Sequence, residues 1–201
     1  GASRADLVGW DSRLVRNLDR GIPGGRVTAR GATWRPVGAL VIAAIWAVSA
    51  ALPIGGYLGG PATFVDSVSI WWYSVALGSL AIVAAIIASL VPGSRFVAGL
   101  AVLLAAGGIA GAIGNALEDA VHVANAEYLY GIGFLAALAA MLGLTLATAV
   151  RRCWPAAGLG GATLAGIVVM AGHGPPLVPV LWLGVGAAGL LGRREALSER
   201  A

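Results

Sequence analysis

The sequence contains no lysine and few charged residues of any kind. Only 11% of its 201 residues are charged, whereas 59% are hydrophobic; an average soluble domain has about 25% charged residues. The single cysteine, Cys153, excludes an internal disulfide, and we expect it to be structural and to lie on the reducing side of a membrane. The shortage of charge excludes an ordinary soluble domain and favours a chain that lies within a bilayer.

Long apolar runs take up most of the chain instead. A helix needs about 20 mainly apolar residues to cross a bilayer. Cutting the chain at its apolar runs predicts six such helices, at Val37–Ile54, Asp66–Val91, Phe96–Leu117, Tyr128–Val150, Ala156–Gly172 and Leu177–Leu191. The last two runs are short and prolines crowd their junction, so they form either two thin spans or one span and a re-entrant segment. We therefore predict an all-α, polytopic membrane helix bundle over residues 36–192, with six spans or, in the second case, five.

Every basic residue is an arginine, and in the six-span arrangement all thirteen lie on one side. They occupy the tail before Val37, the second and fourth linkers, and the tail 193–201. The positive-inside rule places these segments in the cytoplasm. We therefore expect a multi-pass protein of the plasma membrane with both termini in the cytoplasm. Anionic membrane lipids account for the net charge of +4, so nucleic acid is not an expected partner.

The cytoplasmic tail, residues 1–35, contains an amphipathic pattern. Apolar residues recur at helical spacing and arginines oppose them: Leu7, Trp10, Leu14 and Leu18 against Arg13, Arg16 and Arg20. A helix of this kind lies on a membrane surface. The alternative is a disordered tail.

Glycine is concentrated in the third predicted span, most densely over Gly107–Gly114. Small residues four apart let helix backbones approach closely in lipid. This spacing predicts close packing, either within the bundle or in a homo-oligomer.

The outer face, opposite the arginines, collects four carboxylates and both histidines: Asp66, Glu118, Asp119, His122, Glu127 and His173. If the third helix continues, Glu118 and His122 share a face, and Asn115 lies one turn below Glu118 as a hydrogen-bond partner. Adjacent carboxylates repel, so one is expected to keep its proton, which it can then donate. The alternative for Asp119, His122 and Glu127 is a plain solvated loop.

Aromatic residues accompany these acids. Trp71, Trp72 and Tyr73 are consecutive, so at about 100° per residue at least one should point into the bundle. Asp66, Ser69 and Tyr73 share a helix face that we expect to turn inward. A second interpretation makes Asp66 part of a capping box with Thr63. Tyr128 opens the fourth span.

Metal binding has little support in the sequence. Glu118, His122 and His173 are of the types that bind zinc or iron. No HExxH or paired ExxH motif occurs, however, and no aspartate-rich magnesium motif. We expect neither a metal nor an organic cofactor.

The combination of outer acids and aromatic side chains suits the protonation of a lipophilic alkene or epoxide, because aromatic faces stabilise cations. In size, architecture and these residue types, Asp66, Glu118, Asp119, Trp71, Trp72 and Tyr73, the chain resembles the small integral-membrane terpene cyclases of bacterial and fungal meroterpenoid pathways. The resemblance implies a membrane-bound cyclase or isomerase that protonates an isoprenoid-like substrate.

The candidate catalytic residues are then Glu118, Asp66 and Asp119. The candidate substrate contacts are Trp71, Trp72, Tyr73, Asn115, His122 and Tyr128. The alternative is a non-enzymatic membrane subunit, or a lipid-binding or sensory protein, whose outer acidic face meets a partner.

Overall fold

The computed structural model describes residues 34–51, 67–172 and 174–198, and all regular secondary structure in these ranges is helical. The predicted surface helix, Asp66, His173 and the last three residues lie outside the described residues. The all-α prediction is therefore confirmed for the part of the chain that is described.

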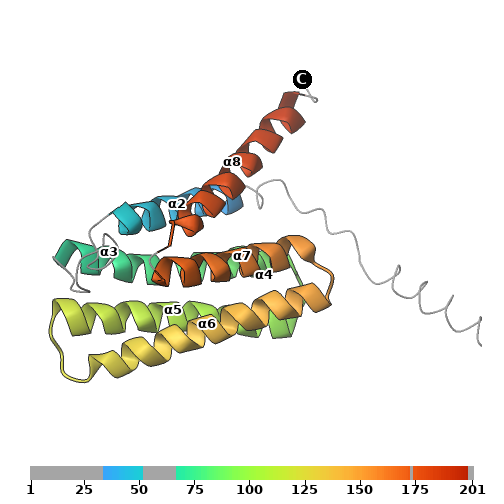
Figure 1. Ribbon diagram of the computed structural model, residues 1–201. Helices are drawn as coiled ribbons and strands as arrows, with labels where there is room; N and C mark the ends of the chain where they lie inside the picture. Colours follow the sequence, from blue (N-terminus) through green and yellow to red (C-terminus); the bar gives the residue numbers. More distant parts are fainter. Residues whose placement is uncertain (1–33, 52–66, 173, 199–201) are drawn as a thin grey trace, which may run out of the picture. The chain divides into compact units, whose positions relative to one another are not determined.

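The helices, in chain order, are α2 (Trp34–Ala51), α3 (Ser67–Gly78), α4 (Leu80–Ser89), α5 (Arg95–Asn115), a π-helical turn η2 (Ala116–Ala120), α6 (Ala126–Val150), α7 (Trp154–Ala171) and α8 (Leu177–Ser198) (Figure 1). Each of the six apolar runs overlaps one of these helices or a consecutive pair. Within the described ranges, five stretches are long and apolar enough to cross a membrane: Trp34–Ala51, Ser69–Ser89, Arg95–Ala120, Ala126–Val150 and Trp154–Ala171. The last apolar stretch, Leu177–Gly192, is shorter.

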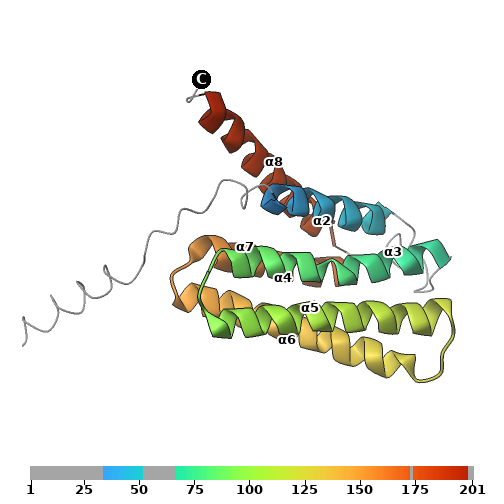
Figure 2. The same ribbon diagram turned by 180° about the vertical axis from the view of Figure 1, so that it is seen from behind.

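The helices from α2 onward pack in layers. In Figures 1 and 2, α3, α4 and α7 lie between the pair α5 and α6 on one side and the pair α2 and α8 on the other. The most extensive contacts are between α5 and α6, and then between α2 and α8. The core consists of apolar side chains from all of the layers, including Ile42, Trp46, Val83, Ile87, Leu104, Met141, Leu144 and Trp182.

The second span is interrupted at its middle, which the sequence did not predict. The α-helix breaks between α3 and α4 at Ser79. The Ser79 hydroxyl donates to the carbonyl of Ala76 at 2.6 Å and accepts from Trp46 Nε1 at 2.9 Å. A serine that bonds back to its own helix tends to bend it, and here the same hydroxyl ties α2 to the bend.

The end of α4 is held by side chains from distant parts of the chain. Arg35 Nη2, in the first turn of α2, donates to the carbonyl of Ser89 at 2.8 Å. Cys153 Sγ, just before α7, donates to the carbonyl of Leu90 at 3.7 Å. A cation is favourable at a helix C-terminus, where the last carbonyls have no helical partner. The Arg35 bond also joins the start of α2 to the end of α4, and the Cys153 bond joins the start of α7 to it.

The glycine-rich stretch of α5 packs within the bundle. A methyl group added at Gly107 would lie 2.7 Å from the backbone nitrogen of Ala137 on α6. Added at Gly114 it would collide with the backbone of Tyr130, and at Gly133 with that of Gly111. Backbones can approach this closely only where no Cβ intervenes. The close helix packing predicted from the glycines therefore occurs within the bundle, between α5 and α6.

Candidate functional site

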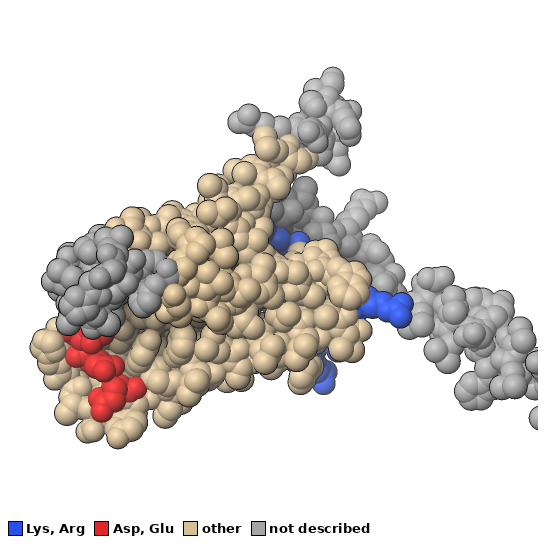
Figure 3. Space-filling model, viewed as in Figure 1, with Lys and Arg blue, Asp and Glu red and all other residues tan. Residues whose placement is uncertain are grey.

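The described charges separate to the two ends of the helices. Acidic side chains gather at one end and basic side chains lie toward the other (Figure 3). The chain order explains this separation. Glu118 and Asp119 follow the last turn of α5 and Glu127 lies in the first turn of α6, whereas Arg95 begins α5 and Arg151 follows α6. We call the first of these the acidic end; it is where the sequence predicts the site.

Glu118 and Asp119 are both carried by the π-helical turn η2. The turn closes with bonds from Val121 N to Ala116 O at 3.2 Å and from Val123 N to Leu117 O at 2.8 Å. π-turns of this kind recur at functional sites. Both carboxylates are half-buried, so they lie at the surface of this end and not deep in the bundle.

The helix does not continue to His122, which corrects the arrangement expected for a continuous α-helix. His122 has φ of 60° and Asn125 has φ of 64°, both in the left-handed region, and both side chains are exposed. The chain therefore turns sharply between η2 and α6. His122 does not take the position one α-helical turn above Glu118 that the sequence suggested.

Asn115 is turned toward α3 and not toward Glu118. Its side chain is 2% exposed, and Nδ2 donates to Ser74 Oγ at 3.0 Å and to the carbonyl of Ile70 at 3.4 Å. Ser74 Oγ donates to the same carbonyl at 3.1 Å. Interhelical hydrogen bonds inside a membrane contribute about 0.6–2 kcal/mol each. Asn115 therefore joins α5 to α3 just below the two acids.

Two tyrosines link α3 to α6 at the same end. The hydroxyls of Tyr73 and Tyr130 are 3.2 Å apart and share a hydrogen bond, and the ring of Tyr130 stacks on Phe134 with centroids 5.9 Å apart. Sequence reasoning did not select Tyr130. A signal was present, because Tyr130, Gly133 and Ala137 recur at helical spacing and form the face of α6 that meets α5.

The remaining predicted contacts are more peripheral. Trp71 is 51% exposed and Tyr128 is 65% exposed, while Trp72 is half-buried. Of the three consecutive aromatics, Tyr73 is thus the one whose contact across the helices is seen. The other two residues that the sequence placed on this face, Asp66 and His173, lie outside the described residues.

The described residues bring no three His, Cys, Asp or Glu side chains together as a metal site would require. The donor sets considered from the sequence included His173, which lies outside them. In the described residues, the half-buried carboxylates of Glu118 and Asp119 lie beside two hydrogen-bonded pairs, Asn115–Ser74 and Tyr73–Tyr130.

No protein family, curated protein or solved structure matches this chain. The resemblance to membrane terpene cyclases therefore rests on size, architecture and residue types.

Proposed function

We propose that the chain is a six-span membrane protein with its arginine-bearing end and both termini in the cytoplasm. The separation of charge between the two ends supports this orientation. The sixth span is Leu177–Gly192. At 1.5 Å per residue it reaches about 24 Å, less than the hydrocarbon core of about 30 Å, and local thinning of the bilayer accommodates such a difference.

Cysteine labelling tests this orientation. In a Cys153→Ala background, a membrane-impermeant maleimide should label Ala124→Cys, in the exposed turn before α6, on intact cells. Pro92→Cys, between α4 and α5, and a cysteine added after Ala201 should react only after permeabilisation. Labelling of the C-terminal cysteine from the same side as Ala124→Cys would show an odd number of spans and contradict the proposal.

At the acidic end we propose acid catalysis on a lipophilic, isoprenoid-like substrate. The observation that carries the proposal is the position of Glu118 and Asp119 in a π-turn next to Asn115 and the tyrosine pair. A carboxylic acid would add its proton to an alkene or epoxide, and the resulting cation would be attacked by a neighbouring double bond to form a ring. Loss of a proton to a carboxylate would complete an isomerisation, with aromatic faces stabilising the cation.

An isotope experiment tests this reaction. Proteoliposomes are incubated in D2O with a prenylated hydroquinone or with its terminal epoxide. We expect a cyclic isomer of the substrate from either probe. The product of the alkene should carry one carbon-bound deuterium, since the initiating proton comes from a carboxyl group that exchanges with solvent; in the product of the epoxide this deuterium lies on the new hydroxyl group and is lost again in H2O. Failure of the folded protein to convert either probe, or conversion equal to that in protein-free vesicles, would reject the enzyme in favour of the second candidate.

The second candidate is a membrane subunit that meets a partner at the acidic end. One observation favours it: apolar side chains are exposed in the turn beside the acids, with Val121 at 55% and Val123 at 43%. An exposed apolar patch rimmed by charge is typical of an interaction site. In that case the buried polar pairs Asn115–Ser74 and Tyr73–Tyr130 would serve to hold the helices together.

A further inference from the structure

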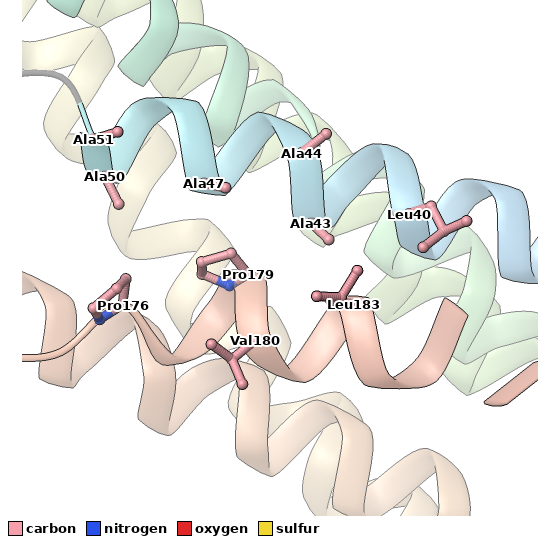
Figure 4. A pocket seen from close by; sticks show the side chains of 10 residues that line it. All are labelled: Leu40, Ala43, Ala44, Ala47, Ala50, Ala51, Pro176, Pro179, Val180 and Leu183. Carbon is pink, nitrogen blue, oxygen red and sulfur yellow. The ribbon is translucent and has the colours of Figure 1, made fainter. Parts of the chain in front are cut away.

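An apolar groove runs between α2 and α8, in a different layer from the acidic end's carboxylates (Figures 1 and 4). Its volume is about 490 Å³, which is within the range of about 300–1,000 Å³ typical of small-molecule sites. Every side chain that lines it is apolar: Leu40, Ala43, Ala44, Ala47, Ala50, Ala51, Pro176, Pro179, Val180 and Leu183. The α2 side consists mainly of alanines at helical spacing, and they are faced by Pro179 of α8 and by Pro176, just before α8.

The groove is closed at one end by direct contact between the two helices. A methyl group added at Gly186 of α8 would lie 2.6 Å from Leu40 Cγ, and one added at Gly189 would lie 3.0 Å from Pro36 Cβ. Toward Ala51 and Pro176 the lining residues are alanine and proline, whose small side chains leave a gap between these parts of the two helices (Figure 4). The helices thus touch in the half that carries Arg35 and separate in the other half.

The depth of the groove corresponds to one leaflet. From Leu40 to Ala51, at 1.5 Å per residue, it extends over about 16 Å of α2, roughly half of the hydrocarbon core of about 30 Å. α2 begins at the arginine-bearing end, beside the end of α4, where Arg35 bonds to the carbonyl of Ser89. α2 therefore ends toward the acidic end, and the part of the groove near Ala51 lies on that side. A membrane-spanning helix from a second chain is about 10–12 Å wide with its side chains. It would cross both leaflets and would need a contact surface through both, whereas this groove extends through only one.

We infer that the groove binds one acyl chain of a phospholipid from the leaflet at the acidic end. The lining has no polar side chain to hold a head group, so the head group stays at the membrane surface and only the hydrocarbon enters. Alanine provides a shallow floor that a flexible chain can follow, and Leu40 and Leu183 border its inner part. The inference rests on the proposed membrane orientation and is independent of the acid chemistry.

Photo-crosslinking in asymmetric vesicles tests the inference. A phosphatidylcholine with a diazirine midway along one acyl chain is placed only in the leaflet that faces the acidic end, and adducts are mapped by mass spectrometry after illumination. We expect adducts to be enriched on the groove walls, at 43–51 and 176–183, above those on exposed positions of α6 such as Ile132 and Leu135. Equal labelling of α6 would mean ordinary surrounding lipid and overturn the inference.

Two variants distinguish occupancy from general contact. Ala47→Phe fills the groove and should reduce the adducts on 176–183 to the level found on α6. Val48→Phe adds similar bulk to the next position, which does not line the groove, and should leave them unchanged. Unchanged adducts in a folded Ala47→Phe protein would overturn the inference. So would strong labelling from the opposite leaflet, or disulfide-linked dimers of Ala47→Cys in the Cys153→Ala background, which would assign the groove to a second copy.

Discussion

Replacing Gly133 with alanine should prevent the bundle from reaching its stable folded state. The added methyl group would meet the backbone of Gly111, with backbone atoms of Ala110 and Gly107 also within 3 Å. Backbone cannot rotate aside as a side chain can, so α5 and α6 would have to separate along their most extensive contact. Overpacking usually costs about 1–3 kcal/mol; we expect at least about 3 kcal/mol here, since packing is what drives helix association in lipid.

Gly131→Ala is the matched control, because a methyl group there meets nothing within 4 Å. Both substitutions lie on α6 and both favour helix formation to the same degree. Thermal unfolding in detergent and elution from a sizing column would be compared for the two. We expect Gly131→Ala to behave like the parent protein. Equal stability of the two variants would show that α5 and α6 do not pack through Gly133.

Glu118→Gln should reduce turnover in the cyclisation assay by roughly the 10²–10⁴-fold that is typical of general acid catalysis. Glutamine keeps the shape of the side chain and removes the exchangeable proton. Because Glu118 is half-buried at the surface of the acidic end, thermal stability should change little. Comparison of the remaining turnover with that of protein-free vesicles would show whether another acid has taken over.

Two further substitutions make the result specific to Glu118. Glu127→Gln removes an exposed carboxylate from the first turn of α6 and should leave turnover nearly unchanged. Asp119→Asn tests the neighbouring acid in the same π-turn. Full activity of Glu118→Gln, with a large loss in Asp119→Asn, would move the proton donor to Asp119. Full activity in both would remove this turn from the mechanism.

The helices of this chain could be predicted from the sequence because they coincide with long apolar runs, which are typical of helices able to span a bilayer. The apolar runs therefore overlap the helices observed. The break at Ser79 could not be predicted in the same way, because it involves Trp46, a partner on another helix. The five-residue π-turn is equally invisible to a pattern that assumes 3.6 residues per turn.

The site was predictable in its position along the chain and less so in its contacts. Placement of Glu118 and Asp119 at one end follows from the order of the spans. The partners of Asn115 do not, because Ser74 and Ile70 lie on α3, more than 40 residues away in sequence. Helical spacing indicates which side chains share a face, but it does not say which helix that face meets. Asn115 of α5 contacts Ser74 and Ile70 of α3. Tyr130 of α6 contacts Tyr73, which is also on α3.

The hydrogen bonds at the end of α4 bear on the order in which the protein is assembled during synthesis. The Ser89 carbonyl receives a side chain made 54 residues earlier, and the Leu90 carbonyl receives one made 63 residues later. Arg35 is already present when α4 leaves the ribosome, so the first hairpin can close at once. The Leu90 carbonyl cannot accept its hydrogen bond from Cys153 until α5 and α6 have both been made. A nascent chain arrested before residue 153 would thus hold its first two spans together while the junction between α4 and α7 still lacks this bond.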